Sequence, residues 1–104
     1  MSDHKLRLFW SPESEADLLD IWGEGARRFS TEIADTHLRD IHAAANRLIE
    51  HPFLSRQRDE LRPGVRSIVV YPTVLFCRVA VDAVEVVRVL DGRRDLPTVF
   101  STES

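Results

Sequence analysis

Three runs rich in β-branched residues follow one another in the C-terminal half of the chain, and they constrain the fold more than any other feature. They span 65–71, 74–81 and 84–90 and are separated by Pro72-Thr73 and Asp82-Ala83. Runs of this composition favour strands, and two-residue connections are typical of antiparallel hairpins. Pro63-Gly64 predicts the turn that leads into the first run. The sequence therefore predicts a three-stranded antiparallel meander.

The N-terminal half shows a short strand followed by helical periodicity. Apolar residues alternate over 6–10, which predicts the strand. Ser11 followed by Pro12 predicts a helix start, because the serine hydroxyl accepts from free N–H groups and proline is tolerated in the first turn. An apolar stripe then recurs at spacings of three and four: Ala16, Leu18, Ile21, Trp22 and Gly25. The stripe weakens after Gly23, so we expect a turn near Phe29.

A second helix is predicted to begin at Ser30 and to end at His51-Pro52, because the residue before a proline is disfavoured in a helix. Its predicted buried stripe is Ile33, Ala34, Leu38, Ile41, Ala45, Leu48 and Ile49. The order of elements is then β-α-α-β-β-β in one domain spanning 1–104. We predict an α+β fold in which a helical hairpin packs on one face of a small, mainly antiparallel sheet. The opposite face or its rim is left for function.

Composition excludes several classes of protein. The apolar runs are far shorter than the roughly 18 residues of a membrane span, so no membrane association is expected. Residues 1–5 lack the layout of a signal peptide. The only cysteine, Cys77, cannot form an internal disulfide, and we expect it to be a buried, inert thiol. These features together predict a cytoplasmic protein.

The net charge of −3 is unevenly distributed along the chain. Residues 1–52 carry six basic and ten acidic groups, whereas 53–104 carry eight and seven. All eight late basic groups are arginines, whose planar guanidinium suits bidentate pairing with carboxylate or phosphate. We therefore expect an anionic partner. A local excess of one positive charge is too small to favour stable binding to duplex DNA.

The residue types argue against acid-base and metal chemistry. Cleavage of RNA needs a proton carrier, yet all four histidines precede residue 52, and Tyr71 and Lys5 are the only residues of their kinds. The remaining candidate bases, Asp59, Glu60 and Asp91, lie close in sequence to arginines, which lower a carboxylate's pKa. His37 and His42 point about 140° apart on a helix and cannot share a metal ion. We predict no catalytic residue, no metal and no cofactor.

At this point particular residues coincide with a known family. They are Ala16-Asp17-Leu18 with Ile21, Leu48 with His51-Pro52, and the segments 58–66, 74–79 and 86–97. In this order and spacing the chain resembles the ParE toxins of the RelE/ParE superfamily over nearly its whole length. It departs from the common family pattern at Ser55, Thr73, Cys77 and Asp91.

The resemblance implies a toxin of a type II toxin-antitoxin system that causes growth arrest, usually through DNA gyrase. It also implies a ParD-like antitoxin with a ribbon-helix-helix N-terminal domain, and contact with operator DNA only through that antitoxin. Two alternatives stay open. Related toxins with this scaffold cut messenger RNA on the ribosome, and the chain could be an antitoxin-binding module that has lost its toxicity.

Candidate binding residues follow from the arginines and the apolar stripes. The predicted antitoxin-binding residues are Leu18, Trp22, Arg58, Arg62, Arg66 and Arg78. The predicted target-binding residues are Arg88, Arg93, Arg94, Leu96 and Phe100. The arginines of segment 56–66 have a second interpretation, in which they fix the loop to the domain by pairing with Asp59, Glu60 and the acidic helices. The apolar segment 96–100 likewise has a second interpretation, as a segment packed on the sheet edge.

Overall fold

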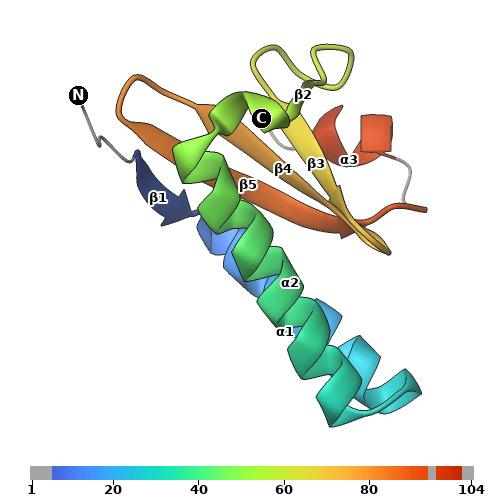
Figure 1. The fold of residues 1–104 in the computed structure, drawn as a ribbon. Coiled ribbons are helices and arrows are strands. Elements are labelled where there is room, and N and C mark those ends of the chain that lie inside the picture. The colour runs from blue at the N-terminus through green and yellow to red at the C-terminus, as the bar shows by residue number, and fades with distance from the viewer. Residues whose placement is uncertain (1–5, 94–95, 102–104) are drawn as a thin grey trace.

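The computed structural model describes residues 6–93 and 96–101, and it has a helical hairpin lying across one face of a five-stranded sheet (Figure 1). The elements in chain order are β1 (Arg7–Trp10), α1 (Pro12–Arg28), α2 (Thr31–Glu50), η1 (Pro52–Leu54), β2 (Arg56–Gln57), β3 (Arg66–Val70), β4 (Thr73–Val79), β5 (Ala83–Asp91) and α3 (Leu96–Ser101). The predicted α+β fold and its β-α-α-β-β-β order are confirmed. Three short elements, η1, β2 and α3, were not predicted.

The strands are arranged in the order β1-β5-β4-β3-β2. The predicted meander forms β3, β4 and β5, and β2 adds a two-residue antiparallel edge. Only β1 is parallel to its neighbour, which is β5. Parallel pairing needs a long connection, and between these two strands the chain passes through the helical hairpin. The prediction of a mainly antiparallel sheet is therefore confirmed.

Both helices begin where their serines predict. The Ser11 hydroxyl accepts from the backbone N–H of Ser14 at 3.0 Å, and the Ser30 hydroxyl accepts from that of Ile33 at 3.1 Å. Each bond satisfies one of the donors that a helix start leaves free. The second helix ends at Glu50, with His51 as its C-cap before Pro52. Among the described residues, no helix has the length and apolar character needed to cross a membrane.

The main core lies between the sheet and only part of the hairpin. From α2 it takes residues of the C-terminal half, and from the sheet it takes β4 and β5 side chains that face the helices: Ile41, Ala44, Ala45, Leu48, Leu75, Cys77, Val84, Val86 and Val89. The rest of the hairpin projects beyond the sheet (Figure 1). The prediction that Ile33 is buried is therefore wrong, because it is exposed on the projecting part. Ala16, which belongs to the predicted apolar stripe of α1, is exposed as well.

The projecting part of the hairpin is held together by its own packing. A Cβ atom placed on Gly25 in α1 would lie 3.4 Å from the Cβ of Ala34 in α2, so the two backbones approach closely here. A methyl group at position 25 would therefore be in van der Waals contact with Ala34, which leaves little room for a larger side chain. The indole N–H of Trp22 also donates to the carboxylate of Asp35 across the hairpin at 2.7 Å.

The opposite face of the sheet is not left uncovered, which corrects the sequence-based expectation. A second apolar cluster of Val65, Phe76, Leu90 and Phe100 lies there, with Leu61 and Leu96 packed against it. The cluster is covered by α3 and by the loop between β2 and β3. The rings of Phe76 and Phe100 meet edge to face with centroids 4.8 Å apart. Of the two interpretations of segment 96–100, packing on the sheet describes its position in this structure.

A β-bulge in β5 decides which residues face the helices. Cys77 is opposite Val86 and Phe76 is opposite Arg88, so Val87 is the extra residue. Beyond the bulge, the alternation of side chains between the two faces of the sheet shifts by one residue. Val89 therefore faces the helical core, and Leu90 packs in the cluster on the opposite face. Arg78 bonds the carbonyl of Pro63 in the loop, whereas Arg88 beside the bulge bonds Asp17 on α1, so the two side chains are directed to different parts of the domain.

Phe100 is 2% exposed, and its ring supplies the main apolar contact of α3 with the sheet. We expect Phe100→Ala to lower the free energy of unfolding by about 3 kcal/mol, because it leaves a cavity against Phe76. Urea denaturation followed by circular dichroism measures this change. The control is Val81→Ala, since Val81 is 98% exposed and its loss should leave the midpoint unchanged. Equal midpoints for both variants would show that α3 does not stay packed on the sheet.

Candidate functional site

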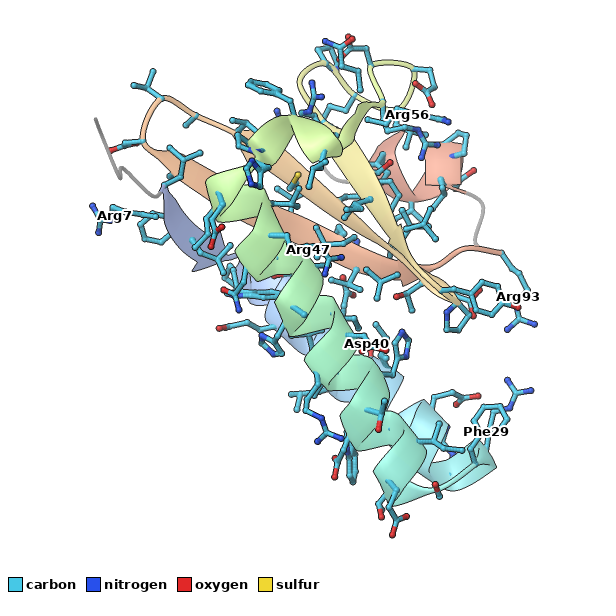
Figure 2. All side chains as sticks on the ribbon, in the orientation of Figure 1. Arg7, Phe29, Asp40, Arg47, Arg56 and Arg93 are labelled. Carbon is cyan, nitrogen blue, oxygen red and sulfur yellow. The ribbon has the colours of Figure 1, made fainter. Side chains whose placement is uncertain are left out.

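The projecting part of the hairpin and the near end of the sheet enclose a groove of about 1100 Å³. One wall comes from α1 and α2, and the other comes from the β3–β4 turn and the C-terminal end of β5. We call this space the inter-layer groove. Phe29 and Arg93, which Figure 2 labels, come from opposite walls of it. It is much larger than a second pocket of about 220 Å³, which Phe53, Arg66 and Val79 help to line.

Large apolar side chains are exposed on both walls of the inter-layer groove. On the helical wall Phe29 is 66% and Ile33 is 53% exposed, and on the sheet wall Val69 is 68% and Tyr71 is 88% exposed. Apolar side chains gathered in one concave surface are typical of a binding site, whereas single exposed ones are ordinary. Sequence periodicity assigned Ile33 to the core, because it cannot show that the helices extend past the sheet.

Asp17, which lines the groove, takes part in an ion pair that joins the two layers. Arg88 on β5 donates from Nε and Nη2 to the two carboxylate oxygens of Asp17 on α1, at 2.8 and 3.0 Å. Asp17 also accepts from the backbone N–H of Val89 at 2.9 Å. The two charged side chains are only 11% and 15% exposed. The hydrogen bonds from Arg88 to Asp17 raise the pKa of the guanidinium above its usual range, despite partial burial.

His37 connects the helical wall to the sheet wall. Its Nε2 lies 3.3 Å from the hydroxyl of Thr73 and 3.4 Å from the carbonyl oxygen of Val70. His42 is directed elsewhere and packs against Trp10 with ring centroids 4.9 Å apart. The two histidines do not meet, as their spacing predicts. Within 6–93 and 96–101, no group of three or more ligand side chains could hold a metal ion.

The four arginines predicted to bind the antitoxin lie together at the other end of β3. We call Arg58, Arg62, Arg66 and Arg78 the arginine edge; Figure 2 labels the nearby Arg56. Their guanidinium groups mostly donate to hydroxyl and carbonyl oxygens of this chain. Their acceptors include the Ser67 hydroxyl for Arg58, the Phe100 carbonyl for Arg62, the Ser55 hydroxyl and carbonyl for Arg66, and the Pro63 carbonyl for Arg78.

The arginine edge therefore holds loop 52–65 and α3 on the sheet. Only Arg58 pairs with a carboxylate, that of Glu60 at 2.7 Å, among the contacts of these four arginines in the described part of the chain. The expectation that the acidic helices supply the partners is wrong, because the arginine edge and the helices lie on different parts of the sheet. A role for these arginines in antitoxin binding stays a prediction.

The candidate general bases are bound to arginines or to backbone. The hydrogen bond from Arg58 lowers the pKa of Glu60, which weakens its carboxylate as a base. Asp59 accepts from the backbone N–H of Gly64 at 3.0 Å. Asp91 pairs with Arg93 at 3.0 Å, and this contact raises the pKa of the Arg93 guanidinium. Burial raises the pKa of the Cys77 thiol, so the neutral thiol predominates at neutral pH.

The predicted target-binding residues occupy different environments. Arg93 has a side chain that is 80% exposed at the end of β5. Leu96 is half-buried and Phe100 is buried under α3, so a target could touch Phe100 only if α3 left the sheet. Arg88 is held by Asp17 and is only 15% exposed, and Arg94 lies outside the described residues. The structure thus does not bring these predicted residues into one exposed patch.

Leu18 and Trp22 lie on α1, away from the arginine edge. Leu18 is half-buried against the main core, and Trp22 is half-buried where it bonds Asp35. Neither side chain lines the inter-layer groove, which uses Ile21 and Gly25 from the same helix. The predicted antitoxin-binding residues therefore fall on two separate parts of the surface, and a single short helix cannot cover both.

Comparison with known proteins gives consistent results. Residues 8–96 match the family described as the ParE toxin of type II toxin-antitoxin system, parDE. Toxin ParE1 of Mycobacterium tuberculosis (strain H37Rv) is 35% identical over 91 residues, which cover 86% of this chain and 93% of that protein. Toxin ParE1 of Caulobacter vibrioides is 36% identical over 80 residues, or 77% of this chain and 82% of that protein.

A solved structure has the same fold. It is titled "Chromosomal ParDE TA system from P. aeruginosa" and matches with a TM-score of 0.74 at 23% identity. The match covers 86% of this chain and 98% of that chain. The two chains therefore share nearly the whole architecture.

The pair of Asp17 and Arg88 should be more important for stability than the exposed pair of Asp91 and Arg93. We expect Arg88→Ala to lower the free energy of unfolding by about 2–4 kcal/mol, because it leaves a nearly buried carboxylate without its cation. Arg93→Ala is the matched control and should leave the urea midpoint unchanged. If Arg88→Ala also left it unchanged, apolar packing alone would hold the layers together at this point.

Proposed function

Because the chain belongs to the ParE toxin family of type II toxin-antitoxin systems, we propose that it arrests growth by inhibiting DNA gyrase. The match to this family over residues 8–96 is the observation that carries the proposal. In the proposed action the toxin binds gyrase and stalls it with the DNA cleaved. A cognate ParD-like antitoxin neutralises the toxin by covering its binding surfaces.

The ion pairing of the charged side chains supports inhibition by binding instead of catalysis. Cleavage of RNA would need a group able to take up a proton next to a cluster of cations. Glu60 and Asp91 are themselves paired with arginines, and the pairing with Arg58 lowers the pKa of Glu60 and weakens it as a base. The proposal that Arg93 contacts the target is supported by the high exposure of its side chain at the sheet's end.

The proposed antitoxin has a ribbon-helix-helix N-terminal domain, and the toxin contacts operator DNA only through it. An antitoxin partner is supported by the solved structure of similar fold, which is described as a ParDE system. It is also supported by the exposed apolar side chains of the inter-layer groove, which a folding segment of another chain could bury. An acidic part of the antitoxin is proposed to lie against the arginine edge.

Purified toxin incubated with gyrase, ATP and supercoiled plasmid should produce linear DNA, which gel electrophoresis after protein digestion detects. For Arg93→Ala we expect that roughly tenfold more protein is needed for the same amount of linear DNA, because an exposed arginine at an interface is a common hot spot. Arg7→Ala is the matched control. It removes an exposed arginine from β1, far along the chain from the proposed contact, and should behave as the unaltered toxin.

If the unaltered toxin produces no linear DNA and causes no loss of supercoiling activity, gyrase is excluded as the target. The alternative, ribosome-dependent cleavage of messenger RNA, is tested in the same strain by mapping transcript ends after induction. New ends that appear before growth stops would replace the proposed function with the ribonuclease. Unaffected growth on expression without antitoxin would indicate a binding module that has lost its toxicity.

A further inference from the structure

We infer that the inter-layer groove binds a cationic segment of the antitoxin, in which lysine or arginine side chains flank an apolar anchor. This inference rests on the proposed function for its partner, and it specifies the chemistry of one contact. The segment is distinct from the acidic part proposed for the arginine edge. The two contacts lie at opposite ends of β3, since Arg66 begins this strand and Val70 ends it beside the groove.

An apolar anchor is required by the side chains that the groove leaves exposed. Phe29 and Ile33 project from the hairpin, and Val69 and Tyr71 project from the sheet wall, each more than half exposed. Burying such side chains contributes roughly 25 cal/mol for each Å² removed from water. A segment with one or two large apolar residues, inserted between these walls, would contact both layers at once.

The charges lining the groove select against an acidic occupant. Six carboxylates line it, against two arginines and one histidine: Asp17, Asp20, Glu24, Glu32, Asp40 and Asp91, with Arg28, Arg93 and His37. Three of these carboxylates are compensated by arginines within the chain. Asp17 pairs with Arg88, Asp91 pairs with Arg93, and Glu24 pairs with Arg27 and Arg28.

The other three carboxylates, those of Asp20, Glu32 and Asp40, form no ion pair with any of the described residues. They come from both helices of the hairpin. A concave surface lined by one sign of charge concentrates the opposite charge, and the apolar walls reduce screening by water. The electrostatic field of the groove therefore favours a lysine or arginine side chain.

Other occupants fit the groove less well. A wholly apolar segment would remove the carboxylates of Asp20 and Asp40 from water without replacing their hydrogen bonds, which is costly. An acidic segment would face like charges. A nucleic acid carries the same sign of charge as the groove. Only a segment that is both apolar and basic satisfies the two kinds of surface present.

The test uses the complete toxin and the antitoxin encoded in the neighbouring reading frame. Synthetic fluorescent peptides of 15 residues, tiled along the antitoxin, are titrated with toxin and followed by anisotropy at low and high salt. We expect one binding peptide to carry net positive charge next to large apolar residues. Its affinity should fall as salt rises, because counter-ions screen the contacts with the groove.

Two double variants identify the groove as the place of binding. Asp20→Asn with Asp40→Asn removes two groove charges, and we expect roughly tenfold weaker binding of the cationic peptide and a smaller salt effect. The matched control, Glu15→Gln with Asp82→Asn, removes two exposed charges that do not line the groove. It changes the net charge equally and should bind as the unaltered toxin does. Urea denaturation verifies that both double variants are folded.

The outcomes separate the groove from the proposed function. If the unaltered toxin binds neither the antitoxin nor any of its peptides, the proposed partner is wrong and the inference fails with it. If the antitoxin binds but the two double variants bind the peptides equally, only the groove inference is overturned. It is also overturned if the peptide that is sensitive to the groove variant is acidic. If Asp20→Asn with Asp40→Asn alters only gyrase inhibition and not antitoxin binding, the groove binds the target, and the inference is overturned.

Discussion

The carboxylate of Asp17 joins the helical layer to the sheet at the point where the two layers begin to separate. It accepts hydrogen bonds from the Arg88 guanidinium and from the backbone of Val89, so it is fixed to both a side chain and a strand. On one side of this point α2 packs tightly through Ile41 and Leu48. On the other side the helices extend without a sheet beneath them, and the inter-layer groove opens. The bulge at Val87 makes this geometry possible, because it sets the alternation that turns Val89 toward the helices.

The charges of the chain are separated in space as well as in sequence. The arginine edge lies beside the beginning of β3, and the carboxylates that line the groove lie beside its end. A partner that covers both surfaces needs segments of opposite charge in a defined order. Such an arrangement favours one register of the partner over others, because a reversed segment would meet like charges at both places. Selectivity among related antitoxins could therefore depend on charge order, in addition to apolar contacts.

Local signals in the sequence were sufficient to predict much of the fold. Ser11 and Ser30 start the helices as expected, and Pro52 follows the end of the second helix, since capping depends on neighbours in sequence. The meander was predicted because its connections are short. Long-range features were not predictable in this way. The six-residue α3 is stabilised by Phe76 and Arg62, which are distant in sequence, and the bulge depends on the pairing of two strands.

The candidate site was less predictable than the fold for a related reason. The sequence identified the arginines as candidate donors, but it did not show that Arg66 and Arg78 donate to carbonyl oxygens of the loop they support. Nor could the helical stripe show that Ile33 lies past the edge of the sheet. The apolar and acidic character of the groove comes from residues of five elements, α1, α2, β3, β4 and β5. No single segment contains a pattern from which that combination can be read.

The parallel pairing of β1 with β5 has a consequence for how the chain acquires its structure during synthesis. The first strand of the described chain lies beside the last one, and Ser11 bonds to Val87 across 76 positions. A ribosome must therefore deliver nearly all of the polypeptide before the sheet can be completed. Nascent chains halted before residue 83 would lack the partner of β1 and the cation of Asp17. Completion of the sheet is thus tied to the synthesis of β5.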